Sequence, residues 1–176
     1  YKPFIITEMS GNHNGELNRA KELVKAASNA GADAIKLQTY TADTITIDHK
    51  GGLFDINDKN SLWYGKNLYS LYSEAHTPWE WHEEIFKYAN SLGLIAFSSS
   101  FDESAVDFLE DLNVPAYKIA SFESNHFPLL KKVAKTKKPI FISTGTSSIN
   151  EVFESINYLK NNGADKIIIF KCTSSY

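Results

Sequence analysis

The sequence predicts an α/β protein with a parallel sheet, either an open doubly wound sheet or part of a (β/α)₈ barrel. Short β-branched runs alternate with longer segments in which apolar residues recur at helical spacing. This alternation is typical of parallel βαβ units. Polar residues follow three of the apolar runs, at 98–100, 143–145 and 173–175. Both fold types place their sites at such strand ends.

The first predicted strand covers residues 4–8, and a helix follows over residues 17–30, where the apolar residues lie three or four positions apart. Gly31 is the expected stop of that helix. The second strand is predicted over residues 34–38. Residues 39–75 are rich in Gly, Asp and Asn and are predicted to form a long loop, and loops of such length are often functional.

Thr77 is predicted to cap the next helix, with Pro78 in its first turn, and the helix should run to Leu92, where Gly93 ends it. The remaining segments continue the alternation. They are predicted as strands over residues 94–98, 116–120, 139–143 and 166–171, and as helices over residues 103–112, 128–135 and 149–162.

Composition narrows the class of protein. A chain of 176 residues with 43% hydrophobic residues is long enough for one domain with a sizeable core. The net charge of −3 and the lack of a Lys/Arg run argue against nucleic-acid and membrane partners. The single cysteine, Cys172, fits a reduced cytoplasmic setting. We expect Cys172 to be a small buried residue, because no acid–base partner is evident beside it.

Glu8 and Lys36 are the first candidate site residues. Glu8 ends the first strand, where a carboxylate faces a ligand or, alternatively, orders a loop. Lys36 lies inside an apolar strand, so its ammonium must point into a barrel interior or pair with an acid, for which Glu8 is the candidate. Gln38 shares the face of Lys36 by the two-residue period of a strand. The alternative is a purely structural Glu–Lys pair.

A second lysine inside an apolar strand, Lys118, is followed by Ser121 and Glu123. Two buried lysines on nearby strands favour a phosphate or a carboxylate ligand. Lysines in barrels also form Schiff bases, so the residue type leaves both chemistries open. Ser143 begins the turn 143–146, which is equally suited to cradle a phosphate or to cap the next helix.

The five histidines predict no metal site in this chain. They form neither an HExxH motif nor a compact cluster. His76 and His82 flank the start of a predicted helix, and we expect them at the surface or in a lid.

The motifs TEMSGNHNG, AGADAIKLQTY, FSSSFD, YKIASFE, ISTGT and KCTSSY are spread over nearly the whole chain. In this order they resemble the sialic acid synthase family. The stretch HTPWEWH and the segment after it resemble the pseudaminic acid branch more than the N-acetylneuraminate branch. The resemblance implies a TIM (β/α)₈ barrel, of which about six βα units are present.

The resemblance also implies a reaction. Carbon 3 of phosphoenolpyruvate attacks the aldehyde of an open-chain 2-acetamido or diacetamido sugar, water adds to carbon 2, and phosphate leaves by C–O cleavage. Lys36 and Lys118, with Ser121 and Ser143, would neutralise the phosphate and the carboxylate. No imine is needed.

By motif position, Glu8 and Glu123 would be the acidic groups near the water and the sugar. The resemblance implies that the substrate pocket is lined by Gln38, Ser99, Phe101, Ser174 and Tyr176.

The family also implies a divalent metal, Mn²⁺ or Mg²⁺, whose histidine ligands come from the last two barrel strands. A C-terminal antifreeze-like domain would reach into a partner's active site, which implies a homodimer at full length. We therefore expect residues 1–176 to be the N-terminal part of the barrel and to be inactive alone. The alternatives are a non-catalytic sugar- or phosphate-binding fragment, an N-acetylneuraminate synthase and, more weakly, a Schiff-base aldolase.

Overall fold

Six parallel strands form one sheet in the order β1-β2-β3-β4-β5-β6 in the computed structural model, which describes residues 2–173. Strands that are neighbours in the sequence are therefore neighbours in space, as in a (β/α)₈ barrel. A doubly wound sheet would reverse its order midway. The strands are β1 (Ile6–Glu8), β2 (Ala34–Thr39), β3 (Ile95–Ser100), β4 (Tyr117–Ile119), β5 (Ile140–Ser143) and β6 (Ile167–Phe170).

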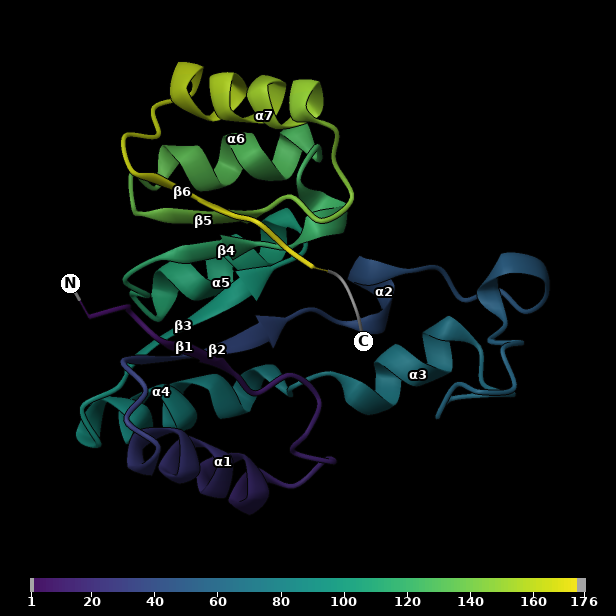
Figure 1. The fold of residues 1–176 in the computed structure, drawn as a ribbon. Helices are drawn as coiled ribbons and strands as arrows, with labels where there is room; N and C mark the ends of the chain where they lie inside the picture. The colour runs from purple at the N-terminus through teal and green to yellow at the C-terminus, as the bar shows by residue number, and fades with distance from the viewer. Residues whose placement is uncertain (1, 174–176) are drawn as a thin grey trace.

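Helices cover the outer face of this curled sheet (Figure 1). Gly31 and Gly93 follow the first and the second of them with φ of 80° each, a left-handed conformation that a side chain would strain. Both predicted helix stops are confirmed. The covering helices are α1 (Leu17–Asn29), α4 (His82–Ser91), α5 (Glu103–Asp111), α6 (Phe127–Lys135) and α7 (Ile149–Asn161).

Two apolar layers hold the sheet. The larger layer lies between the strands and the helices and includes residues such as Ile35, Leu37 and Ile119. The smaller layer lies on the inner face, where Ala34, Phe97 and Ala116 are buried and Ile6 and Phe141 pack against them. Because side chains alternate along a strand, the next side chains that point inward lie two residues further along each strand, toward its carboxyl end. The polar side chains of the site occupy those positions.

The segment 39–75 is not the plain loop that its composition predicts. It contains two helices, α2 (Ala42–Ile45) and α3 (Leu68–Ala75), and a 3-10 turn at Gly52–Phe54. Asn67 caps α3 by accepting a hydrogen bond from the Ser70 N–H at 2.7 Å. The segment projects beyond the barrel on the side of its carboxyl ends (Figure 1). A helix of eight residues gives too few periodic positions to stand out in a polar sequence.

The predictions for Thr77 and His82 are wrong. Thr77 does not cap a helix: a 3-10 turn at Trp79–Trp81 follows Pro78, and α4 begins only at His82. The Thr77 hydroxyl instead contacts the buried His13, with 3.2 Å between Oγ1 and Nε2. His82 is fully buried rather than at the surface, because its ring packs behind the ends of two strands.

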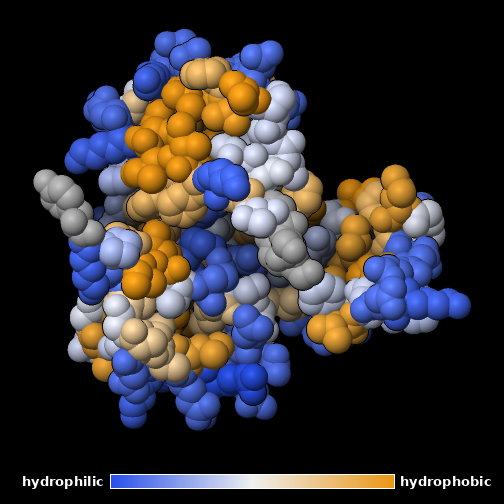
Figure 2. Space-filling view, in the orientation of Figure 1, coloured by the Kyte–Doolittle hydropathy of each residue, from blue (hydrophilic) through white to orange (hydrophobic). Residues whose placement is uncertain are grey.

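The two outer strands leave part of the sheet uncovered. Within residues 2–173, β1 and β6 each pair with a single neighbouring strand. Apolar surface gathers over β6, where Ile168 and Ile169 are partly exposed (Figure 2). Hydrophilic side chains line the hollow beside it (Figure 2). Among the described residues, no helix combines the length and the apolar character needed to span a bilayer.

Candidate active site

A cavity of about 610 Å³ opens at the carboxyl ends of the strands. Every candidate site residue within the described part of the chain lines it, although these residues come from five strands and the turns that follow them. The remaining two candidates, Ser174 and Tyr176, lie outside the described residues. The lining candidates are Glu8, Lys36, Gln38, Ser99, Phe101, Lys118, Ser121, Glu123 and Ser143.

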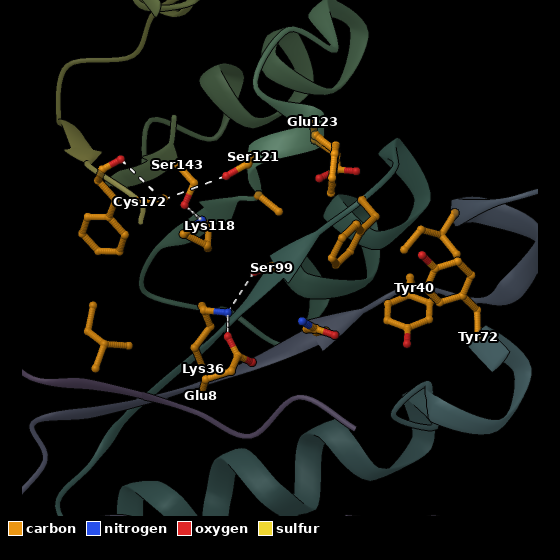
Figure 3. Close-up of a pocket in the computed structure, with 17 residues that line it drawn as sticks. Glu8, Lys36, Tyr40, Tyr72, Ser99, Lys118, Ser121, Glu123, Ser143 and Cys172 are labelled. Carbon is orange, nitrogen blue, oxygen red and sulfur yellow. Dashed lines mark hydrogen bonds and ion pairs between the residues drawn. The ribbon is translucent and has the colours of Figure 1, made fainter. Parts of the chain in front are cut away.

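Lys36 links three strands at one side of this cavity (Figure 3). Its Nζ forms an ion pair with Glu8, which lies opposite it in the register of β1 and β2, and donates a hydrogen bond to Ser99 Oγ at 3.2 Å. Burial, and then the positive charge of Lys118, lower the pKa of Lys36 to about 7. The Glu8 carboxylate favours the charged lysine and opposes that shift. The predicted Glu8–Lys36 pair is confirmed.

Lys118 is 6% exposed and points to the same cavity from β4. Its Nζ donates to Ser143 Oγ at 2.6 Å and to the Ile119 carbonyl at 2.7 Å, and it lies 5.8 Å from the centre of the Phe170 ring. Burial lowers the pKa of Lys118 to about 8, although nearby Cys172 and Glu123 favour the charged form. Two poorly solvated ammonium groups in one cavity favour an anionic ligand.

Glu123 gives the cavity its second acidic group. It lies in a 3-10 turn at Ser121–Glu123, directly after β4. Its Oε2 is buried and has no hydrogen-bond partner among the described residues. Burial raises the pKa of this carboxyl, and Lys118 opposes that effect. Glu123 is therefore suited to hold a proton and to give it to a ligand.

The turn after β5 is tied to the 3-10 turn after β4 rather than to α7. Gly145 N–H donates to Ser121 Oγ at 3.2 Å, and the Thr146 hydroxyl donates to the Ser121 carbonyl at 2.9 Å. The cap of α7 is Ser148, which forms a capping box with Glu151. The capping alternative for residues 143–146 is therefore wrong, and these residues hold Ser121 at the edge of the cavity.

An aromatic wall, defined as Tyr40, Tyr72 and Phe101, closes the other side of the cavity. The Tyr40 ring meets both other rings edge to face, with centroids 5.7 Å from Tyr72 and 5.3 Å from Phe101. Burial, and then Tyr72, raise the pKa of Tyr40 to about 12, so its hydroxyl remains a hydrogen-bond donor. Strand alternation after Gln38 could have identified Tyr40, whereas nothing in the sequence places Tyr72 from α3 in the site.

Cys172 was also not identified as a residue of the cavity. It is partly exposed and lines the site after β6, so the prediction of a buried packing residue is wrong. Burial raises the pKa of the thiol, but hydrogen bonds from Ser143, the Thr144 backbone and Ser121, with the charge of Lys118, outweigh it and lower the pKa below its ordinary value.

A family model described as the NeuB family matches residues 23–176. The chain is 45% identical over 175 residues to a pseudaminic acid synthase of Campylobacter jejuni, and 44% identical over 174 residues to one of Helicobacter pylori. Each alignment covers 99% of this chain, but 50% and 51% of those proteins. The chain thus spans about half the length of the curated relatives it matches.

The fold is shared with a solved N-acetylneuraminic acid (sialic acid) synthetase of Leptospira borgpetersenii. The TM-score is 0.83 at 24% identity, and the match covers 100% of this chain and 56% of that chain. At this identity the likeness establishes the fold alone, a barrel that curls as the six strands do here. The family model matches most of the sequence and includes Lys36, Lys118 and Glu123. This chain belongs to the NeuB family.

Proposed function

We propose that the full-length protein carrying this chain condenses phosphoenolpyruvate with an open-chain acetamido sugar and releases phosphate. The observation that carries this proposal is the pair of buried lysines, Lys36 and Lys118, each bonded to a serine in one cavity at the carboxyl ends of parallel strands. The 45% identity to a pseudaminic acid synthase favours a diacetamido sugar and a pseudaminic acid-type product.

The lysine side of the cavity is assigned to phosphoenolpyruvate. Lys36 of β2 with Ser99 and Lys118 of β4 with Ser143 provide two cationic donor groups, and Ser121 adds a hydroxyl. Charge-assisted hydrogen bonds to phosphate and carboxylate are stronger than neutral ones. A trianionic substrate therefore gains most where two ammonium groups are already poorly solvated.

The two carboxyl groups are assigned to proton transfer. Carbon 3 of phosphoenolpyruvate bonds to the aldehyde carbon, and Glu123 protonates the aldehyde oxygen as its negative charge develops. Water adds to carbon 2 and gives one proton to Glu8. The hydroxyl proton of that adduct leaves with phosphate as the C–O bond breaks, which leaves a 2-keto acid. Both protons of the water are thereby accounted for.

The aromatic wall and Gln38 are assigned to the sugar. Aromatic faces pack against apolar parts of a ligand, while Gln38 and the Tyr40 hydroxyl supply a few directed hydrogen bonds. Phe101 and Ile45 add apolar surface to the lining. The cavity thus offers cationic donors for an anion together with aromatic and amide groups for a sugar.

We further propose that the full-length protein is a cytoplasmic homodimer that binds Mn²⁺ or Mg²⁺, which would supply a Lewis acid when bound. Within residues 2–173, no three His, Cys, Asp or Glu side chains gather as a metal site would need. His13 and His82 are occupied by buried hydrogen bonds. The described residues of this chain therefore do not form a metal site by themselves, and the proton transfers above are assigned to Glu123 and Glu8 alone.

The test is turnover by the full-length protein, with phosphate release and product mass measured together. We expect phosphoenolpyruvate and a diacetamido hexose to yield a nonulosonic acid and one phosphate per product. A mono-acetamido hexose should react at least about tenfold less efficiently, as loss of a recognised polar group usually costs. Preference for the mono-acetamido sugar would indicate an N-acetylneuraminate synthase, and binding without turnover would indicate a non-catalytic module.

A further inference from the structure

Three buried polar side chains meet on the helix side of the sheet, directly behind the cavity. Thr39 ends β2, Ser98 lies in β3, and His82 is the first residue of α4; each has an exposed fraction of 0%. Thr39 Oγ1 lies 2.9 Å from His82 Nε2 and 2.6 Å from Ser98 Oγ. Such a group is stable in a core because every member is hydrogen-bonded.

The direction of these hydrogen bonds follows from the backbone. His82 Nδ1 lies 3.2 Å from the Pro78 carbonyl, which can only accept, so Nδ1 carries the proton. The ring is neutral, because burial lowers the pKa of His82 to about 4. Nε2 therefore accepts from the Thr39 hydroxyl, and the Thr39 oxygen accepts from Ser98.

The turn before α4 holds the same strand end at a second point. Trp79 Nε1–H donates to the Tyr40 carbonyl at 3.2 Å. The rings of Trp79 and His82 both pack on Phe108 of α5, with centroid distances of 4.7 Å and 5.3 Å. The turn is thus fixed between the end of β2 and a helix that follows β3, and it cannot shift without moving one of them.

The chain neighbours of these buried residues line the cavity. Thr39 lies between Gln38 and Tyr40, and Ser98 precedes Ser99, the residue that accepts from Lys36. Successive side chains of a strand point to opposite faces, so the buried contacts hold the strands from behind while their neighbours face the ligand. A displacement of about 1 Å at such positions is enough to slow a reaction strongly.

We propose that His82 is a positioning residue, which through Thr39 and Ser98 fixes the ends of β2 and β3 and so sets the places of Gln38, Tyr40 and Ser99 in the cavity. His82 does not line the cavity and takes no part in the chemistry. The turnover part of its test rests on the proposed function. The binding part of the test, which uses sulfate as the probe, is independent of the proposed function.

The test compares matched variants of the full-length protein, below the melting temperature of each. Thr39→Val removes the hydroxyl at nearly constant shape, and Thr39→Ser keeps it. His82→Phe removes both nitrogens, and His82→Gln keeps an acceptor near the place of Nε2. We expect Thr39→Val and His82→Phe to lower kcat/KM about tenfold or more, with a raised KM for the sugar, and Thr39→Ser and His82→Gln to recover most of that loss.

Sulfate affinity, measured by calorimetry on the same proteins, gives the second reading. Thr39→Val should weaken it through Ser99 and Lys36, whereas Thr39→Ser should not. If the parent protein shows no turnover, the proposed function fails and the sulfate comparison alone decides the positioning role. Variants that melt earlier but keep kcat, KM and sulfate affinity would overturn the proposal, as would equal losses in Thr39→Val and Thr39→Ser. If Thr39→Val does not fold, Ser98→Ala replaces it, since it removes the other hydrogen bond of Thr39, and the same losses of kcat/KM and sulfate affinity are expected.

Discussion

Two ammonium groups with lowered pKa values decide how the cavity responds to pH. The pKa of Lys36 is about 7 and that of Lys118 about 8, mainly because burial disfavours their charged forms. A bound dianion favours the charged forms and raises both values, so binding takes up protons. Anion affinity is therefore greatest below pH 7 and falls as the pH rises through 7 and 8.

Sulfate tests this dependence cleanly, because it does not titrate in that range. We expect its dissociation constant to rise at least about tenfold between pH 6 and pH 9, as measured by isothermal titration calorimetry. Lys36→Met should bind sulfate more weakly and lose the part of the dependence near pH 7. An affinity that stays constant with pH, or that increases toward pH 9, would mean that the lysines do not bind the anion.

Lys118 acts as a charge in this account and not as a nucleophile. In the full-length protein, Lys118→Met should lose a contact worth roughly 1.5–3 kcal/mol, and so at least about tenfold in kcat/KM. Borohydride added during turnover should leave the protein mass unchanged, because no imine forms. A borohydride-dependent adduct mapped to Lys118 by peptide mass spectrometry would instead support the aldolase alternative.

Some residues of the cavity could be predicted from the sequence, and others could not. Lys36 and Lys118 were predictable because a charged side chain inside an apolar strand needs a partner or a ligand. Tyr72 was not predictable, since its place depends on how a projecting segment folds back over the cavity. Cys172 resembled a packing residue, and only the fold brings it to Ser121 and Lys118.

At the scale of elements, the sequence predicted the sheet better than the connections. Apolar runs marked all six strands, and β2 to β5 are buried on both faces over much of their length. The helix α3 was missed, since it is short and depends on its Asn67 cap and on contacts with α2. The burial of His82 was missed because a polar residue at a helix start usually faces solvent.

The burial of His82 also predicts how stability depends on pH. Its pKa is about 4 in the folded chain and near 6.5 when unfolded, so between these values the unfolded chain binds more protons. The free energy of unfolding should therefore decrease as the pH falls from 6.5 to 4, by up to about 3 kcal/mol. The buried His13, whose pKa is also lowered, acts in the same direction.

Urea unfolding at pH 7 and pH 4.5 measures this effect. His82→Phe should be less stable than the parent at pH 7, because Thr39 loses its partner, yet its stability should change less between the two pH values. A parent protein as stable at pH 4.5 as at pH 7 would show that His82 is not held neutral by its surroundings.

The two open edges of the sheet determine how the whole molecule is expected to associate. The described part of the chain leaves β1 and β6 paired on one side only, and apolar side chains of β6 are exposed. Such edges recruit other chains. We expect residues 1–176, prepared alone, to associate with increasing concentration in sedimentation velocity, and Ile169→Lys on β6 to reduce that association. A monomer that unfolds cooperatively in thermal melts would contradict this expectation.

We propose that the protein carrying this chain joins phosphoenolpyruvate to a sugar aldehyde with cleavage of the C–O bond. The most direct measurement uses phosphoenolpyruvate labelled with ¹⁸O in the oxygen that bridges carbon 2 and phosphorus, together with the full-length protein and a diacetamido hexose. We predict that the label leaves in phosphate, in amounts that match the sugar acid formed. Phosphate free of the label would rule out C–O cleavage, and no phosphate released beyond that of a Lys118→Met control would rule out the condensation.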